Sequence, residues 1–330
     1  EWTNVVDAWQ LKTADAYADV PRLGRKNRMG RKQRDRLWPV FARVIGELDS
    51  RGFVTEAGVF QAMAQHYGGK AEKPFDHIVV DEAQDLGVPE LRFLVAIAPA
   101  GADALFFAGD LGQRIFQQPF SWKALGVNVT GRSTTLKVNY RTSHQIRETA
   151  DRLLPGAVTD VDSRDEERKG TVSVFNGPDP IVVVAADSAA EQAAVANFIN
   201  AALADGVLPE DIGVFVRTRD VMGRAREAVK AAGRDASEIT LHKEGPAGSV
   251  RIGVMHLAKG LEFKAVAVMA CDEDVLPLKA RLDAVADETE LDDVFDTERQ
   301  LFYVACTRAR DRLMVSGVKP GSQFMADLER

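Results

Sequence analysis

The sequence predicts an α/β protein in which an N-terminal helical subdomain is followed by two domains with largely parallel sheets. Apolar residues in the first part recur at helical spacing, as at Leu37, Val40, Phe41, Val44, Ile45 and Leu48. From about residue 75 the pattern changes to short apolar runs that end in polar turns, and a second series of such runs begins near residue 171. Strands that alternate with helices in this way are typical of parallel sheets covered by helices.

Three parts are expected along the chain: the helical subdomain over 1–72, the remainder of the first domain over 73–165, and the second domain over 166–330. The charged stretch within 155–170 is the expected hinge, and helices are expected at 189–203 and 219–232. Because the apolar runs are continuous, we expect both faces of the strands to be buried. The strands are expected at 77–80, 104–108 and 136–140, and then at 171–175, 181–185, 212–216, 250–255, 265–269 and 312–316.

Composition limits the classes of protein that need to be considered. The 330 residues carry 42 Lys and Arg against 49 Asp and Glu, a net charge of −7, so any contact with nucleic acid must be local. Neither a membrane-spanning apolar run nor a signal peptide is found, so we expect no membrane partner. The two cysteines, Cys271 and Cys306, form no CxxC pair, which favours a cytoplasmic protein with both thiols as small core residues.

Two adjacent carboxylates, Asp81 and Glu82, follow the apolar run that ends at Val80. Open α/β sheets bind ligands at the carboxyl ends of their strands. An Asp in this place suits Mg²⁺, and a neighbouring Glu can orient and deprotonate an attacking water, as phosphoryl transfer requires. A solvated strand end is the alternative, but the longer pattern through Gln84 and Asp85 favours function.

This segment resembles the second motif of the UvrD/Rep family of superfamily 1 DNA helicases, and four later segments resemble further motifs of that family in order. They are Phe106–Phe116, Val138–Thr142, His256–Phe263 and Glu298–Ala309. The resemblance covers residues 75 to 315 and implies two RecA-like domains that couple ATP hydrolysis, with Mg²⁺, to 3′ to 5′ movement on single-stranded DNA. It also implies a role in DNA repair.

The resemblance also implies roles for single residues. The catalytic group comprises Glu82, Gln113, which senses the γ-phosphate, Arg141, which contacts it, and Arg308, the arginine finger. The nucleotide-binding group comprises Asp81, which holds Mg²⁺, Gly260, and Glu262, which meets the ribose. His256 is the residue that meets DNA.

The residue types alone leave alternatives open. Arg141 and Arg308, arriving from different domains, could converge on a triphosphate and stabilise the transferring group, or each could form a surface ion pair. His256 could equally be a satisfied core histidine at a strand end. Gly260 could simply form a tight turn at a helix start, with Glu262 as a charge that complements the helix dipole.

Aromatic residues near the third motif are candidates for stacking on DNA bases. Phe116, Phe120 and Trp122 are the residues concerned, and core packing is the stronger alternative for the two phenylalanines. The family usually has an aromatic residue where this chain has Gln118. Stacking at that position is therefore in doubt.

A basic run over residues 22–36 carries eight Lys and Arg against the single acid Asp35. Such a run could bind phosphates with a salt-dependent affinity, and Arg25, Lys26 and Arg28 are the candidate DNA contacts. A solvated loop explains the run equally well.

No Gly-rich phosphate loop of the form GxxxxGK[ST] occurs in the sequence. The Gly69–Lys70 pair is followed by Ala71, and Ala64 stands where the motif needs its first glycine. We therefore expect a fragment of a larger helicase that is inactive alone, with the loop supplied by a missing N-terminal segment or another chain. The accessory insertion that the family carries between the strand at 212–216 and His256 is nearly absent.

Two other functions stay open. The first is a non-hydrolysing module that binds single-stranded or partly duplex DNA, or a protein, without a phosphate loop. The second is a Mg²⁺ nuclease, since Glu262 and Lys264 fit an E-x-K pattern. That pattern belongs on a strand preceded by an Asp-bearing strand, whereas Glu262 follows a Lys-Gly turn.

Overall fold

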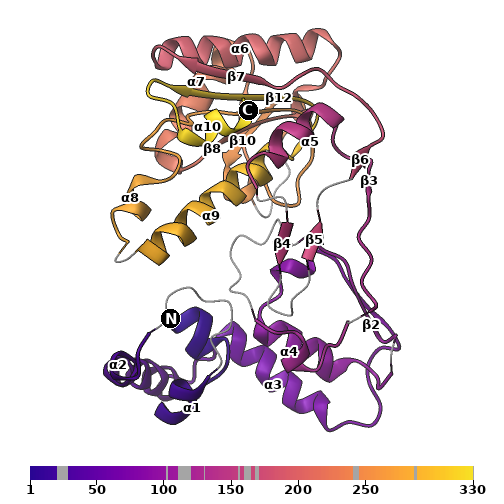
Figure 1. Cartoon of the computed structure of the whole chain (residues 1–330), viewed down its shortest axis with the longest axis vertical. Helices are drawn as coiled ribbons and strands as arrows, with labels where there is room; N and C mark the ends of the chain where they lie inside the picture. The colour runs from indigo at the N-terminus through magenta and orange to yellow at the C-terminus, as the bar shows by residue number, and fades with distance from the viewer. Residues whose placement is uncertain are drawn as a thin grey trace. The chain divides into compact units, whose positions relative to one another are not determined.

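The computed structural model separates into two compact units, each of which is considered by itself (Figure 1). The first comprises residues 1–134 and 158–166, and the second comprises residues 135–157 and 167–330. The segment 135–157, expected in the first domain, thus groups with the second unit, and the exact domain boundaries stay a prediction. The structure describes residues 1–20, 29–101, 103–110, 120–129, 131–154, 157–159, 165–167, 171–240, 245–285 and 288–329.

Helices dominate the first part of the first unit, as the apolar spacing predicts. Thr13 and Thr55 begin two of them by accepting hydrogen bonds from backbone N–H groups of the first turn, which is the usual role of an N-cap. A cluster around Val5, Tyr17 and Phe41 forms a core within residues 2–45. The helices of this unit are α1 (Ala14–Asp19), α2 (Arg31–Ser50), α3 (Glu56–Gly68) and α4 (Val88–Ile97).

Two short parallel strands, β1 (Ile78–Val80) and β2 (Leu105–Phe107), form the described sheet of the first unit. The expectation that both faces are buried is wrong here, because Val79 and Phe106 are 73% and 62% exposed. These two residues lie opposite each other in register, so both project from the same face of the sheet. On the other face Phe107 packs against Trp122.

A six-stranded sheet in which every pair of neighbours is parallel forms the centre of the second unit. Its order is β7-β12-β11-β8-β10-β9. The strands are β7 (Ile181–Ala185), β8 (Ile212–Val216), β9 (Ala236–Glu238), β10 (Val250–Val254), β11 (Phe263–Val268) and β12 (Ala309–Val318). The predicted α/β class with a parallel sheet is confirmed, and β9 is a strand that the apolar runs did not predict.

Helices lie on both faces of this sheet, with α6 above it and α9 below it in Figure 1. The central strand β8 is buried throughout because both faces of the sheet are covered, as the continuous apolar runs predict. Cys271 and Cys306 are fully buried free thiols, as predicted. The helices of this unit are α5 (His144–Asp151), α6 (Ser188–Ala204), α7 (Met222–Ala231), α8 (Lys279–Leu282), α9 (Glu288–Cys306) and α10 (Gln323–Leu328).

Two further pairs of short strands lie outside the large sheet: β3 (Val138–Asn139) with β6 (Val172–Ser173), and β4 (Ala157–Thr159) with β5 (Asp165–Glu167). The runs at 136–140 and 171–175 were expected in the sheets of two different domains, and this is wrong. They pair with each other because the Lys137 carbonyl accepts a hydrogen bond from the Val172 N–H group. A further bond from the Ser143 N–H group to the Arg310 carbonyl ties this segment to the second unit.

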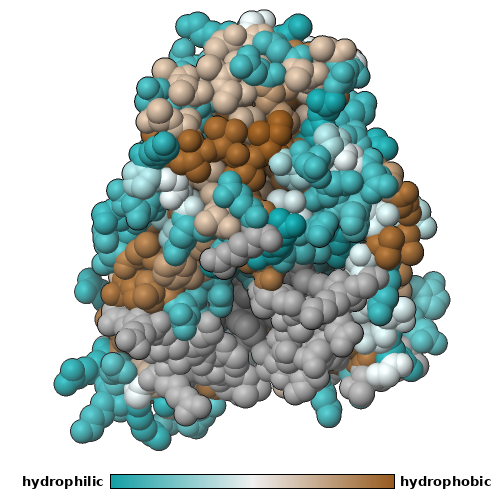
Figure 2. All heavy atoms as spheres, turned by 45° about the horizontal axis from the view of Figure 1, so that its top comes forward, coloured by the Kyte–Doolittle hydropathy of each residue, from teal (hydrophilic) through white to brown (hydrophobic). Residues whose placement is uncertain are grey.

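The surface of the second unit carries apolar side chains at one edge of its sheet. Ile181 and Val184 of the edge strand β7 are 46% and 39% exposed. Figure 2 shows a band of hydrophobic residues across the upper half of the view. Within the described residues, no helix combines the length and the apolar content needed to cross a membrane.

Candidate functional site

Acidic residues follow both strands of the first unit at the edge where parallel strands end. Asp81 is exposed and Glu82 half-buried after β1, and Asp110 follows β2 at the same edge because Val80 lies opposite Phe107. Glu82 has a left-handed backbone, with a φ of 52°, and the Asp81 side chain accepts a hydrogen bond from its N–H group at 2.8 Å. The chain that carries the two predicted carboxylates thus turns sharply directly after the strand.

A buried glutamine braces this turn. Gln84 is 3% exposed; its amide nitrogen donates to the Glu82 carboxylate and its amide oxygen accepts from the Asp110 N–H group at 3.0 Å. A Cβ atom at Gly109 would lie 2.5 Å from that amide oxygen, so the brace requires glycine there. Gln84 was not among the predicted site residues, because burial of a polar turn residue is not visible in the sequence.

The chemistry of these donors fits Mg²⁺. Carboxylate oxygens are its preferred protein ligands, and one or two of them commonly hold the ion together with phosphate oxygens. Throughout the part of the chain that the structure describes, no group of three or more His, Cys, Asp or Glu side chains could enclose a metal ion.

The second group of candidate residues lies on the turn between β10 and β11 of the second unit. A short 3-10 turn over Met255–Leu257 leaves His256 exposed, so the core-histidine alternative is wrong. Partial burial, followed by the charges of Arg217 and Arg219, lowers the pKa of His256 below its ordinary value, which favours the neutral imidazole. Gly260 has a φ of 77°, a left-handed conformation that favours glycine.

An ion pair joins two of the predicted nucleotide contacts. The Nε atom of Arg141 lies 2.8 Å from Oε2 of Glu262, and the two side chains are 49% and 43% exposed. Asn139 holds the backbone of this segment, since its side-chain oxygen accepts from the N–H groups of Arg141 and Thr142. Glu262 precedes strand β11 rather than lying in a first helical turn, so the helix-dipole alternative is wrong.

Arg308 lies at the junction of α9 and β12 and is 1% exposed. Its Nε atom donates to the Val304 carbonyl at 3.1 Å, and its Nη1 atom donates to the Leu261 carbonyl at 3.3 Å. The guanidinium is therefore buried against backbone, and the surface ion-pair alternative is wrong for this residue. Arg141 and Arg308 belong to the same compact unit, so the expectation that they come from different domains is also wrong.

A buried carboxylate at the first position of the last motif segment organises the second unit. The Glu298 side chain is 0% exposed and accepts two hydrogen bonds of 2.6 Å from Arg217, which follows β8, and one of 2.8 Å from Arg281 of α8. Burial alone would raise the pKa of Glu298, but the hydrogen bonds and charge of Arg217, and then of Arg281, hold it below its ordinary value. This cluster was not among the predicted site residues.

Several predicted residues cannot be placed. Gln113 and Phe116, and the basic residues Arg25, Lys26 and Arg28, lie outside the described residues. Trp122 is half-buried and packs edge to face on Phe107, with ring centroids 4.8 Å apart. It is thus engaged in packing of the first unit.

The two halves of the E-x-K pattern have different partners. Glu262 pairs with Arg141, whereas Lys264 lies 2.9 Å from a carboxylate oxygen of Asp211. A nuclease site would need both side chains to act on one metal-bound phosphate. Their separate ion pairs do not support that alternative.

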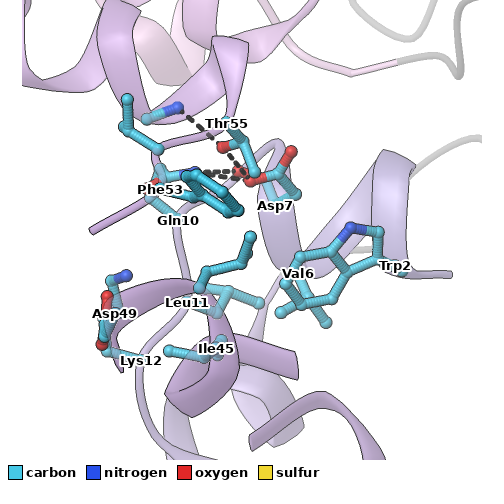
Figure 3. A pocket seen from close by; sticks show the side chains of 13 residues that line it. Trp2, Val6, Asp7, Gln10, Leu11, Lys12, Ile45, Asp49, Phe53 and Thr55 are labelled. Carbon is cyan, nitrogen blue, oxygen red and sulfur yellow. Dashed lines mark hydrogen bonds between the residues drawn. The ribbon is translucent and has the colours of Figure 1, made fainter. Parts of the chain in front are cut away.

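The clearest hollow in the first unit is small and is not lined by any predicted site residue. It has a volume of about 70 Å³ and lies among η1 (Trp2–Asp7), α2 and the start of α3. Figure 3 shows its polar side, where the Asp7 carboxylate accepts hydrogen bonds from Gln10 at 2.8 Å and Thr55 at 2.6 Å. Because these polar groups form hydrogen bonds with one another, they connect the segments that line the hollow and leave few polar atoms for a ligand.

A hollow of about 380 Å³ lies between α6 and the edge of the sheet in the second unit. Ile181, Val183, Phe198 and Met314 are among its apolar lining residues. None of the predicted site residues lines it.

Comparison with known proteins agrees with the motif geometry of the second unit. Residues 233–319, which include the turn with His256 and Glu262 and the helix with Glu298, match the family model of the UvrD-like helicase C-terminal domain. This segment is therefore similar to a UvrD-like helicase C-terminal domain. The predicted resemblance to the UvrD/Rep helicases is thereby confirmed.

Similar proteins carry helicase names. The chain is 26% identical over 289 residues to DNA helicase IV of Escherichia coli, and this match covers 81% of the chain and 38% of that protein. ATP-dependent DNA helicase UvrD1 of Mycobacterium tuberculosis is 44% identical over 82 residues, covering 25% of the chain and 9% of that protein. The chain spans well under half of either relative. A solved C-terminal domain of a possible DNA helicase from Lactobacillus plantarum is 22% identical with a TM-score of 0.40, covering 58% of the chain and 94% of that domain.

Tyr140 lies within the predicted motif segment Val138–Thr142 but was not among the predicted site residues. It adjoins Arg141 and is 72% exposed, although the run around it was expected to be a buried strand. An exposed aromatic ring beside an arginine can receive a flat heterocycle by stacking. Its position between two polar motif residues was the signal available in the sequence.

Proposed function

We propose that the chain supplies motor elements of an ATP-dependent DNA helicase or translocase. The observation that carries the proposal is the meeting of Arg141 and Glu262 at 2.8 Å in the unit that matches a UvrD-like helicase C-terminal domain. These residues come from two separate motifs about 120 positions apart in the sequence, and a fold that joins them builds one polar site from both.

ATP supplies the reacting phosphate in this proposal, and the chain's own residues position it. Once their ion pair opens, Arg141 binds the γ-phosphate and Glu262 the ribose, and Gly260 gives the turn the conformation that presents Glu262. In the first unit Asp81 holds Mg²⁺ and Glu82 orients and deprotonates the attacking water, steadied by Gln84. Arg308 serves as the arginine finger only if its guanidinium leaves the two carbonyls that it now contacts.

DNA is the proposed track. His256 contacts the DNA strand as a neutral imidazole. The other residues proposed to contact DNA, or to couple ATP hydrolysis to movement on it, are Gln113, Phe116, Trp122, Arg25, Lys26 and Arg28. The protein is also proposed to move in the 3′ to 5′ direction, to act in DNA repair and to lie in the cytoplasm.

The test is ATP hydrolysis by the full-length protein that contains this chain, with and without oligo-dT. We expect DNA-stimulated hydrolysis that falls by about a hundredfold or more in Glu82→Gln, the size of a general-base contribution. Asp103→Asn is the matched control, since that carboxylate is 93% exposed and precedes β2, away from the edge that carries Glu82. An unchanged rate in Glu82→Gln, with the fold intact by circular dichroism, would refute the assignment.

A non-hydrolysing DNA- or protein-binding module is the second candidate. The buried guanidinium of Arg308 favours it. Salt-sensitive binding of oligo-dT without any hydrolysis of ATP by the full-length protein would make it the better description.

A further inference from the structure

The edge strand β7 of the large sheet is open along one side. It pairs with β12 on its inner side, and within the described residues no strand pairs with its outer side. The Ala185 carbonyl accepts a hydrogen bond from the Lys319 N–H group at 3.0 Å, and alternate residues of a strand face the same neighbour. Val182 and Val184 therefore direct their backbone N–H and C=O groups outward, where a further strand can pair with them.

This edge lacks the features that commonly prevent such pairing. Edge strands are usually blunted by charged side chains, prolines or bulges. The five residues of β7 are all apolar, and their register with β12 is unbroken. The opposite edge strand β9 differs, since its Glu238 forms an ion pair with Arg226. Pro180 precedes β7 and lacks an N–H group, so a further strand can pair only from Ile181 onward.

The hollow of about 380 Å³ between α6 and the sheet adjoins this edge, and α6 lies beside β7 in Figure 1. Ile181 and Val183 of β7 line it, together with Phe198 of α6. Side chains that lie opposite each other on paired strands point to the same face of a sheet. A residue opposite Val183 on a further strand would therefore enter the hollow, whose apolar walls suit an aromatic ring.

Acidic side chains lie at both ends of the open edge. Asp179 is exposed, lies two residues before β7 and lines the hollow, and Asp187 is exposed two residues after β7. Asp187 accepts a hydrogen bond from the neutral Ala190 N–H group and thus keeps its charge. Arg312 also lines the hollow, but Asp205 forms an ion pair with it. The ends of the edge are therefore net negative.

We propose that the open edge of β7 binds an extended, positively charged segment of a partner protein as an additional strand, with an aromatic side chain in the hollow. A second copy of this chain fits less well. Antiparallel pairing of two β7 strands over all five residues would place Asp179 of each copy opposite Asp187 of the other, and like charges in that arrangement are destabilising. Lysine or arginine at these two positions of a partner strand instead forms two ion pairs. This contact involves neither ATP nor DNA, so it is independent of the proposed motor function.

A synthetic peptide tests whether the edge accepts a strand of this kind. The probe is a fluorescein-labelled peptide with the sequence KTVTFTVTK, which carries lysine at both ends and phenylalanine at the centre of one face. Fluorescence anisotropy with the 330-residue chain should show saturable binding of one peptide per chain. A dissociation constant above about 1 mM, the weak end of specific association, would overturn the proposal.

Two N-methylated forms of the peptide test for pairing through the backbone. Residues of a strand direct their N–H groups alternately to its two sides, so methyl groups on alternate residues block one side only. One form is methylated at its fourth and sixth residues, and the other at its fifth and seventh. One form should lose at least about tenfold in affinity, since two hydrogen bonds are lost, and the other should bind nearly as the unmodified peptide does. Equal affinities of the two forms would show that the peptide does not bind as a strand.

The hollow is tested by a matched pair of substitutions on α6. Ala201 is exposed and lines the hollow, so Ala201→Phe fills it without removing a core side chain. Peptide affinity should fall by at least about tenfold, because the aromatic ring of the peptide loses its buried position. Ala193→Phe, at an exposed position of the same helix outside the hollow, should leave the affinity unchanged. Equal losses in the two variants would contradict a role of the hollow.

The acidic ends are tested by the double variant Asp179→Asn, Asp187→Asn. Asparagine retains the N-cap of α6, so the fold is expected to remain. Peptide affinity should fall by about fivefold at low salt, as the loss of two exposed ion pairs implies, and by less at high salt. Asp220→Asn, Asp235→Asn removes two exposed charges elsewhere in the same unit and should have no effect. A similar loss in this control variant would mean that general electrostatics, and not the edge, attracts the peptide.

The oligomeric state of the chain distinguishes a partner protein from a second copy. Sedimentation of the 330-residue chain without peptide should show a monomer. A dimer that Val184→Lys dissociates would assign the open edge to self-association and overturn the proposal, since that side chain is 39% exposed on β7. None of these measurements involves nucleotide, so their failure would leave the hydrolysis test of the motor unaffected.

Discussion

Glu298 shows how a single buried charge can organise the end of a parallel sheet. Its carboxylate joins β8, α8 and α9 through Arg217 and Arg281, and the Leu278 N–H group donates to it as well. The Arg217 side chain is only 9% exposed, so each charge depends on the other for compensation. The same arginine lies close enough to help lower the pKa of His256.

Glu298→Gln should therefore destabilise the second unit by about 3–5 kcal/mol, because it leaves a buried guanidinium without its counter-charge. Urea denaturation at neutral pH measures this. Glu148→Gln, on a carboxylate that is 61% exposed and has only loose ion pairs of 3.7 and 3.8 Å, should change stability by less than about 1 kcal/mol. Equal effects of the two substitutions would show that burial of Glu298 does not matter.

The same residue predicts a pH dependence. The pKa of Glu298 is lower in the folded chain than its ordinary value of 4.5, so folding favours the ionised carboxylate. Its contribution is complete above the unfolded value and is lost as the pH falls through the folded value. The difference in stability between wild type and Glu298→Gln should thus be constant near neutral pH and shrink below about pH 4.

For single residues, the sequence predicted which side chains carry the chemistry more reliably than it predicted their burial and their contacts. The carboxylates after β1 and the pair Arg141 and Glu262 came from motif patterns, and the structure places the pair in contact. Burial depends on residues distant in sequence, which is why the buried state of Arg308 could not be predicted. The brace by Gln84 depends likewise on the approach of Gly109 from the next strand.

At the element scale, the continuous apolar runs were reliable wherever helices cover both faces of the sheet. The runs at 181–185 and 212–216 match β7 and β8 residue for residue. Runs of the same texture at 136–140 and 171–175 instead form a two-stranded pair, because a short apolar run does not specify its partner. The three-residue strand β9 has no apolar run and could not be predicted in that way.

Strand β12 closely approaches the segment that follows β11. A Cβ atom at Gly317 would lie 2.4 Å from the Cys271 carbonyl oxygen, and that backbone is held by its own hydrogen bond to β12. Gly317→Ala should therefore destabilise the second unit by about 1–3 kcal/mol. Gly223→Ala in α7, where no atom lies within 4 Å, should stabilise it by about 0.5–1 kcal/mol.

Urea denaturation of the two glycine variants measures both signs in one experiment. The two substitutions add the same methyl group to the same unit, so a difference in sign isolates the effect of local space. Loss of stability in both variants would mean that the helix position of Gly223 is constrained in a way its open surroundings do not explain.

At the scale of the whole molecule, the division of the chain decides which segment can fold by itself. The sequence predicted a second domain over 166–330, whereas the second unit also includes residues 135–157. Within that added segment Ile146 and Ala150 are fully buried, and Arg152 donates to the Leu328 carbonyl at 2.7 Å. The position of the cut therefore matters, because α5 completes the packing on one side of the unit.

Residues 135–330 expressed alone should unfold in one cooperative transition, and residues 166–330 should be less stable by about 3 kcal/mol or more. The loss follows from exposing the surface that Ile146, Ala150 and Leu153 cover, at about 1.5–3 kcal/mol for each large apolar side chain. Urea denaturation followed by circular dichroism compares the two segments. Within the longer segment, Ile146→Ala should reproduce most of the deficit, whereas His144→Ala, on a side chain that is 52% exposed, should not. Equal stability of the two segments would place α5 outside the folding unit and restore the boundary that the sequence predicts.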